Sequence, residues 1–150
     1  MFVTAKDDGL IPYVLTQILD ACVNGVTLSD PDLPDNPIVY ANQAFEAMSG
    51  YSQEDIVGRN CRFLQGADRN QEALDTIRAA LQKHDSCVVT LRNYRKNGEL
   101  FFNRLSIRPL VDREGQVIYY LGVQYDVTDQ VKAQAELEKL QFELDKRASG

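Results

Sequence analysis

Three strand-like segments follow one another in the second half of the chain, and they constrain the fold more than any other feature. They span about residues 86–96, 100–111 and 116–127, and short turns at Asn97-Gly98 and at residues 112–115 separate them. Strands joined by turns this short pair antiparallel, because a parallel pair needs a crossover of roughly a dozen residues or more. The sequence therefore predicts an antiparallel sheet.

The first half of the chain supplies two further strands and several short helices. We expect the strands at residues 25–29 and 38–41, joined through a proline-containing turn at 30–37. Helices are expected at 43–48, 53–57, 60–64 and 71–83. This order predicts an α+β fold, a five-stranded antiparallel sheet with short helices on one face and a pocket between the two layers.

Both ends of the chain are predicted to be helical. One helix is expected at 10–22, and another runs to about residue 147 after a cap at Thr128 or Asp129. The second helix carries a narrow apolar seam of about two heptads, too short for an independent coiled coil; its members are Ala133, Leu137, Leu140 and Leu144. We therefore divide the chain into an N-terminal helical extension (1–24), a core (25–128) and a C-terminal helix (129–150).

Several classes of function are disfavoured by what the sequence lacks. No apolar run is long enough to span a membrane, and the first residues do not resemble a secretion signal, so a cytoplasmic location is expected. Cys22, Cys61 and Cys87 are widely spaced without a CxxC pair, which argues against disulfides or a zinc site. His84 is the single histidine, so a histidine-based metal site or activated nucleophile is also disfavoured.

Charge is distributed unevenly along the chain. Residues 59–111 carry ten basic and five acidic side chains, although the whole chain has a net charge of −6. A nucleic-acid-binding protein is usually basic overall, so no nucleic-acid partner is expected. The basic middle indicates either a local site for a small anion or ordinary solvated surface charge.

Two asparagines interrupt the apolar inner faces of neighbouring strands. Asn93 shares a face with Val89 and Leu91, and Asn103 shares one with Leu105 and Ile107. A three-residue loop at Asn97-Gly98 would place the two amides directly opposite each other, whereas a two-residue loop would shift the pairing by one. Buried amides need partners; these two would bond to each other or to loop backbone, or would face the edge of a heterocycle.

The last strand is apolar on both faces. Gln124 lies on the face that also carries Ile118, Tyr120 and Gly122, and the opposite face is more apolar still. A sheet of this kind must be covered on both sides. The inner face is expected to meet the short helices, and the outer face a terminal helix or a second subunit.

The densest group of chemically useful side chains lies between Gly58 and Gly66. If residues 60–65 are helical, Cys61 and Gln65 are four residues apart on one face and can address the same object. Arg62 points to another side, where Arg69 and Arg78 can join it. Three arginines would suit a phosphate group through charge-assisted hydrogen bonds.

The hexapeptide at residues 60–65, NCRFLQ, resembles that of the LOV domains, the flavin-binding blue-light sensors of the PAS superfamily. The resemblance covers roughly residues 25–128. Its other matching segments are residues 30–38 (DPDLPDNPI), Tyr40-Ala41-Asn42, Phe45, Gly50-Tyr51-Ser52, residues 92–98 (RNYRKNG), Asn103, Gly122-Val123-Gln124 and Asp126-Val127-Thr128. A PAS-like sheet with helical extensions at both ends is the fold that this resemblance implies.

The resemblance implies a role for each matching residue around a bound FMN. Cys61 would be the photoactive thiol, which bonds reversibly to the ring carbon C4a after light absorption. Gln124 would bond the ring near O4 and N5 and reorient when N5 becomes protonated. The remaining implied contacts are Asn93 and Asn103 to the pyrimidine edge of the ring, Asn60 and Gln65 beside the ribityl chain and ring, Arg62, Arg69 and Arg78 to the phosphate, and Leu64, Leu105 and Ile107 to the apolar part of the ring.

These roles imply a blue-light photoreceptor without enzymatic turnover. The chain is similar to the short bacterial LOV proteins, and we expect a homodimer in which Gln124 changes hydrogen bonding on the last strand and shifts the terminal helices or subunits, with an unknown downstream protein partner. A flavin-binding redox or PAS sensor without photoadduct chemistry is one alternative. A ligand-free dimerisation module is another.

Overall fold

The computed structural model describes residues 10–149, so residues 1–9 of the predicted N-terminal extension lie outside the described part. Five strands form one antiparallel sheet in the order β2-β1-β5-β4-β3. The strands are β1 (Gly25–Ser29), β2 (Ile38–Ala41), β3 (Cys87–Tyr94), β4 (Leu100–Val111) and β5 (Val117–Asp126). The α+β architecture predicted from the sequence is confirmed.

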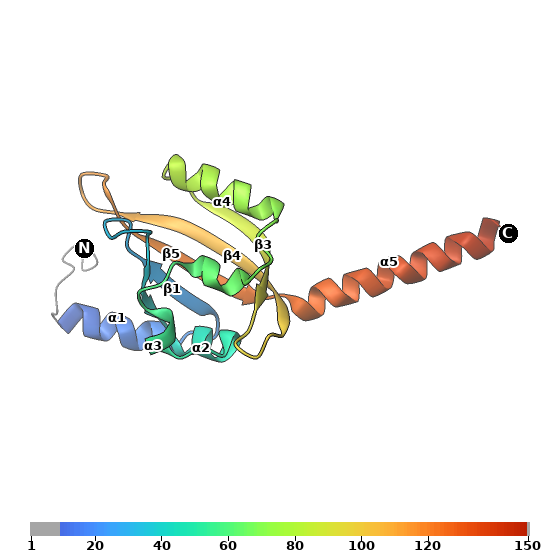
Figure 1. Cartoon of the computed structure of the whole chain (residues 1–150), viewed down its shortest axis with the longest axis horizontal. Helices are drawn as coiled ribbons and strands as arrows, with labels where there is room; N and C mark the ends of the chain where they lie inside the picture. Colours follow the sequence, from blue (N-terminus) through green and yellow to red (C-terminus); the bar gives the residue numbers. More distant parts are fainter. Residues whose placement is uncertain (1–9, 150) are drawn as a thin grey trace.

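Short helices connect β2 to β3 and cover one face of the sheet (Figure 1). They are α2 (Gln43–Ser49), α3 (Gln53–Ile56), the 3-10 helix η2 (Cys61–Gln65) and α4 (Glu72–Gln82). Local sequence sets their ends. The Asn42 carboxamide oxygen accepts from the Phe45 amide at the start of α2, and Gly50, with φ of 78°, ends it in the left-handed conformation. The Ser52 hydroxyl accepts from the Asp55 amide and begins α3.

The core divides into two apolar clusters. In the first, Leu74 of α4 packs on β3, β4 and β5, where Leu91 and Leu105 are among its buried neighbours. In the second, Phe45 of α2, Ile56 of α3 and Leu64 of η2 pack beside β2. The two clusters leave a space between them over the middle of the sheet.

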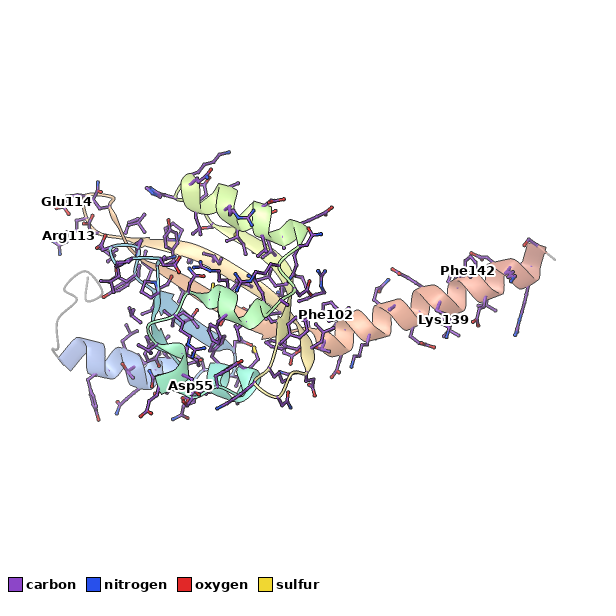
Figure 2. The ribbon with its side chains drawn as sticks, viewed as in Figure 1. Asp55, Phe102, Arg113, Glu114, Lys139 and Phe142 are labelled. Carbon is purple, nitrogen blue, oxygen red and sulfur yellow. The ribbon has the colours of Figure 1, made fainter. Side chains whose placement is uncertain are left out.

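Helices extend the fold at both ends. The helix α1 (Leu10–Asp20) is joined to the core at its C-terminal end, where the Leu19 carbonyl accepts from Asn42 and the Asp20 carboxylate accepts from the Tyr40 hydroxyl. The helix α5 (Thr128–Ser149) follows β5 almost directly and projects away from the sheet (Figure 1). Phe142 and Lys139 stand out from its distal half (Figure 2).

The start of α5 differs from expectation. The helix begins at Thr128, but the Thr128 hydroxyl does not cap it. This hydroxyl donates to the Asp126 carboxylate and accepts from the Phe102 amide, while Asp126 also accepts from the Thr128 amide. The prediction that Thr128 or Asp129 caps the helix is therefore wrong, because both residues lie within α5 and the Thr128 hydroxyl links β4 to the end of β5 instead.

Candidate functional site

A cavity of about 210 Å³ lies between the two core clusters. The five strands of the sheet supply one wall, and α2, η2, α4 and the 30–37 loop supply the others. Most of the predicted site residues line it: Asn60, Cys61, Arg62, Leu64, Gln65, Arg78, Asn93, Asn103, Leu105, Ile107 and Gln124. Residues from distant parts of the sequence thus meet in one enclosed space, which is the usual form of a small-molecule site.

The helix η2 carries Cys61 into the cavity wall. Its N-cap is Asn60, whose carboxamide oxygen accepts from the Arg62 amide at 3.0 Å and whose amide nitrogen donates to the Asp35 carbonyl at 2.8 Å. Asn60 therefore ties the start of η2 to the 30–37 loop. This contact explains how a single short turn can hold a cysteine in a defined position.

The type of helical turn corrects one expectation. With three residues per turn, a 3-10 helix aligns residues three apart, so Cys61 stacks over Leu64 and not over Gln65. The prediction that Cys61 and Gln65 share one helical face is therefore wrong. Both residues still line the cavity, because the cavity wraps around more than one side of η2.

Cys61 is an exposed residue, and it lines the cavity. Burial by the surrounding protein raises the pKa of the Cys61 thiol above its usual value of 9.0, and the positive charge of Arg62 opposes this shift only in part. The thiol is therefore neutral at pH 7. The site holds a protonated thiol instead of a preformed thiolate.

Asn93 and Asn103 contact each other on the sheet wall. The Asn103 amide nitrogen donates to the Asn93 carboxamide oxygen at 3.0 Å, and both residues are fully buried. They are not directly opposite: Asn93 pairs with Phe101, and Asn103 pairs with Leu91. The loop does have three residues, but it begins at Lys96, since the Arg95 amide donates to the Glu99 carbonyl. The expected register is therefore wrong by two residues, and the amides are diagonal neighbours on one face.

Gln124 lies on β5 beside this pair. Its amide nitrogen donates to the Thr27 hydroxyl at 3.1 Å. Its placement on the inner face with Ile118, Tyr120 and Gly122 is confirmed by the alternating burial of β5. The side chain reaches the cavity from the central strand of the sheet.

Buried oxygens without hydrogen-bond donors test whether a flavin fits. Among the described residues, the carboxamide oxygens of Asn36, Asn103 and Gln124 are buried without a partner, and all three residues line the cavity. An unpaired buried acceptor is costly, so a donor-bearing occupant is expected. A flavin ring presents N–H and C=O groups along one edge, and its ribityl chain carries hydroxyls. The residues therefore fit the group that the resemblance implies.

The three predicted phosphate arginines do not behave alike. Arg62 and Arg78 line the cavity, where Arg62 forms an ion pair with Asp35 and Arg78 forms one with Asp75 at 2.7 Å. Arg69 is not among the lining residues, and its side chain donates to the Gly66 carbonyl. The structure thus brings two of the three arginines together at the cavity.

Sequence reasoning missed several residues of the cavity wall. Thr27, Asn36, Phe45 and Tyr120 line it, and Thr27 and Asn36 are polar. Thr27 lies on the same strand face as Gly25 and Ser29, so alternation along β1 offered a signal once the inner face was known. Asn36 has φ of 47° and follows Asp35 with φ of 67°, a loop geometry that no periodic pattern predicts.

Comparison with known proteins identifies the family. Residues 23–129 match the PAS domain family. A solved light-oxygen-voltage domain, studied with a flavin analogue, is 42% identical with a TM-score of 0.74, and the match covers 89% of this chain and 99% of that one. The chain belongs to the LOV family of PAS domains. The predicted resemblance is confirmed.

Two further relatives show the breadth of the family. The LOV domain is 41% identical over 133 residues to a blue-light photoreceptor of Listeria innocua, and the match covers 89% of this chain and 52% of that protein. A solved RNA-binding light-oxygen-voltage receptor is 35% identical with a TM-score of 0.82, covering 94% of this chain and 39% of that one. The chain spans about half or less of the length of the first curated relatives it matches.

The described helices also bear on membrane association. Within residues 10–149, no helix combines the length and apolar character needed to cross a membrane.

Proposed function

We propose that this LOV domain is a blue-light sensor that binds FMN in the cavity and uses Cys61 as its photoactive nucleophile. The observation that carries the proposal is the shared cavity: a protonated thiol on η2 and buried, donor-less amide oxygens on β4 and β5 line the same space. When bound, FMN would supply absorption of blue light and an electrophilic ring carbon, C4a, toward which the Cys61 sulfur would act as the nucleophile while its proton passes to the flavin.

The chain's own residues hold and orient the flavin. Asn93 and Asn103 are hydrogen-bonded to each other on the cavity wall. Their side-chain amides offer both donors and acceptors, as the pyrimidine edge of the ring requires. Leu64, Leu105 and Ile107 line the cavity and would supply apolar contacts to the ring, and Asn60 and Gln65, which also line it, would contact the ribityl chain. These contacts would hold the ring close to Cys61, as bond formation between two positioned groups requires.

Arg62 and Arg78 receive the terminal phosphate. Their present partners, Asp35 and Asp75, form exposed ion pairs. Exposed pairs contribute little free energy, so either arginine can turn to a phosphate at small cost. The Arg69 side chain joins the phosphate site once its hydrogen bond to the Gly66 carbonyl is broken. Because riboflavin has no phosphate for these arginines to bind, their presence supports FMN over riboflavin.

The signal leaves the cavity through Gln124 and β5. A change in the hydrogen bonds of Gln124 alters β5, which lies between β1 and β4 in the sheet and leads directly into α5. We propose that the terminal helices or the subunits of a homodimer respond to this change. The LOV domain itself then senses light without enzymatic turnover, and a downstream protein partner reads the response.

An absorption spectrum tests the photochemistry. The purified protein should be yellow, should bleach under blue light and should recover in the dark. The variant C61A should keep the flavin and lose the bleaching, whereas C87A, which changes a cysteine outside the cavity lining, should behave as the wild type. A wild-type spectrum that does not bleach reversibly would exclude the proposal, and identification of the released flavin tests the preference for FMN.

A further inference from the structure

The 30–37 loop is the wall of the cavity with the least support from the core. The other walls, which are the sheet and the helices α2, η2 and α4, all contribute residues to the two apolar clusters. Among the described residues, none between 30 and 37 belongs to either cluster, and residues 32–35 are exposed. Local opening occurs where few apolar contacts are buried, so this loop is the wall that opens at the lowest cost in free energy.

The loop is hydrogen-bonded within itself. The Leu33 amide donates to the Asp30 carbonyl and the Asn36 amide donates to the Leu33 carbonyl, both at 3.2 Å. At the base of the loop, the Asp30 amide donates to the Pro37 carbonyl at 3.0 Å. Three of the eight loop residues are prolines, whose rings restrict the backbone further. We therefore expect the loop to move as one unit instead of unravelling.

Asp35 ties this loop to η2 through two contacts. Its carbonyl accepts from the Asn60 amide nitrogen at 2.8 Å, and its carboxylate forms an ion pair with Arg62. Both partners lie at the start of η2 and line the cavity. Asp35 thus joins two neighbouring walls of the cavity.

The backbone at Asp35 and Asn36 has an unusual conformation. Their φ angles are 67° and 47°, in the left-handed region that residues other than glycine seldom adopt, although Asn and Asp adopt it more readily than most. Such a conformation persists where surrounding contacts fix it, as they often do at ligand clamps. The contacts of Asp35 with η2 supply this constraint, and they keep Asn36 in the cavity wall.

We propose that the 30–37 loop is the gate through which flavin enters and leaves the cavity, and that Asp35 is the latch that closes this gate onto η2. The inference rests on the proposed function and adds the route that the flavin takes. Asp35 is a positioning residue, because it acts through the loop and is not itself a lining residue of the cavity. Loss of its carboxylate should make the loop open more often and leave the shape of the closed cavity unchanged.

Exchange of bound riboflavin tests the gate, because riboflavin lacks the phosphate that would also use Arg62. The protein is loaded with riboflavin and mixed with excess free FMN, and the flavin that remains bound is identified by chromatography over time. We expect D35N to exchange its flavin about two- to fivefold faster than the wild type, as the loss of an exposed ion pair implies. D35G removes the same carboxylate, tolerates a positive φ and should also exchange faster.

The variant D75N is the matched control. Asp75 forms an exposed ion pair with Arg78, which lines the cavity as Arg62 does. Because Asp75 and Arg78 both belong to α4, their pair does not join two walls. D75N should therefore exchange its flavin at the wild-type rate.

A second measurement follows the loop directly. Amide hydrogen exchange in the segment 33–37 of the purified protein should be about two- to fivefold faster in D35N than in the wild type and D75N. This measurement needs no photoreaction. It remains decisive for the latch if the wild type binds flavin without bleaching, a result that would refute the proposed photochemistry alone.

Three results would overturn the inference. The first is riboflavin exchange in D35N that is no faster than in the wild type. The second is an equal acceleration in D75N, which would show that the charge near the cavity matters and the loop does not. The third is unchanged hydrogen exchange in the loop of D35N, which would mean that Asp35 does not hold the loop closed.

Discussion

Asn93 and Asn103 depend on each other at the cavity wall, and this dependence can be measured. In N103L the buried oxygen of Asn93 loses its donor, so we expect the free energy of unfolding of flavin-free protein to fall by about 1–3 kcal/mol. In the double variant N93L/N103L both polar groups are replaced, and most of this loss should be regained. Urea denaturation of the three proteins measures both steps.

The outcome separates two uses of the amides. Flavin retention should fall in both variants, because the polar edge contacts are gone in each. A double variant less stable than N103L would contradict the idea that the pair stabilises the fold only through mutual satisfaction. Equal flavin retention in all three proteins would contradict the proposed edge contacts.

Cys61 has a pH dependence that follows from its surroundings. Burial raises the pKa of the Cys61 thiol above 9.0, whereas a cysteine in water ionises near a pH of about 8.5. Because a raised pKa keeps the proton bound, most of the thiol should stay neutral as the pH rises from 6 to 8. The amplitude of bleaching should therefore be nearly flat across this range, and a decline that is half complete by about pH 8.5 would show that the thiol ionises like an exposed one.

At the scale of elements, one polar cluster joins the segment between η2 and α4 to the edge strand β3. The Asp68 carboxylate accepts two hydrogen bonds from Arg92, at 2.6 and 2.8 Å, and one from the Tyr94 hydroxyl at 2.7 Å. Gln71 adds bonds to the amide and carbonyl of Arg92. These contacts fix the position of α4 and protect the backbone of an edge strand from pairing with another chain.

The cluster predicts a loss of stability in acid. The hydrogen bonds from Arg92 lower the pKa of Asp68 from 3.8 to about 2. Since the folded-state pKa is depressed, the stabilisation is present above pH 3.8 and disappears as the pH falls towards 2. D68N should lower the urea midpoint at pH 7 and flatten its decline between pH 4 and 2. D75N removes the carboxylate of the exposed Arg78 pair and should change neither quantity appreciably.

The elements show what sequence patterns can and cannot determine. The bounds of β1, β2 and β4 were predicted correctly, because alternation and turn residues mark both ends of these strands. The register of β3 with β4 was predicted two residues away from its observed value. A shift of two residues keeps every side chain on the same face, so burial patterns cannot detect it. The loop itself decides the register, and it begins at Lys96.

The candidate site was predictable where a local motif defined it. The hexapeptide at 60–65 and the inner-face amides led to Cys61, Asn93, Asn103 and Gln124, all of which line the cavity. Thr27 and Asn36 were missed because their roles depend on pairing between β1 and β5 and on the shape of the 30–37 loop. Alternation places Thr27 on a face of β1 but does not say which face is inner, and no spacing in the sequence encodes the shape of the loop.

The whole molecule presents two apolar surfaces that suit a second copy of the chain. Along α5, Leu137, Leu140 and Leu144 are exposed, and the helix projects away from its own sheet (Figure 1). The outer face of β5 carries half-buried apolar residues, among them Leu121 and Val123. A homodimer that covers these surfaces is the assembly we propose.

Charged substitutions on α5 test the dimer. L137E and L144E place carboxylates in the seam, so the double variant should shift the protein towards monomer when its mass is measured by light scattering after gel filtration. Q141E lies outside the seam and should leave the mass unchanged. A double variant with the wild-type mass would exclude α5 from the interface and leave the outer sheet face as the contact.

The strand β5 leads into α5 with one residue between them, so the direction of the helix depends on the end of the strand. Its 22 residues extend for about 33 Å, and its base is held by Asp126, which bonds both Thr128 and Arg95. If α5 tilts about its base by about 5°, its far end moves by about 3 Å, given that length. In the signalling route that we propose, a rearrangement no larger than one side-chain amide would thus give a displacement comparable to half a helical turn.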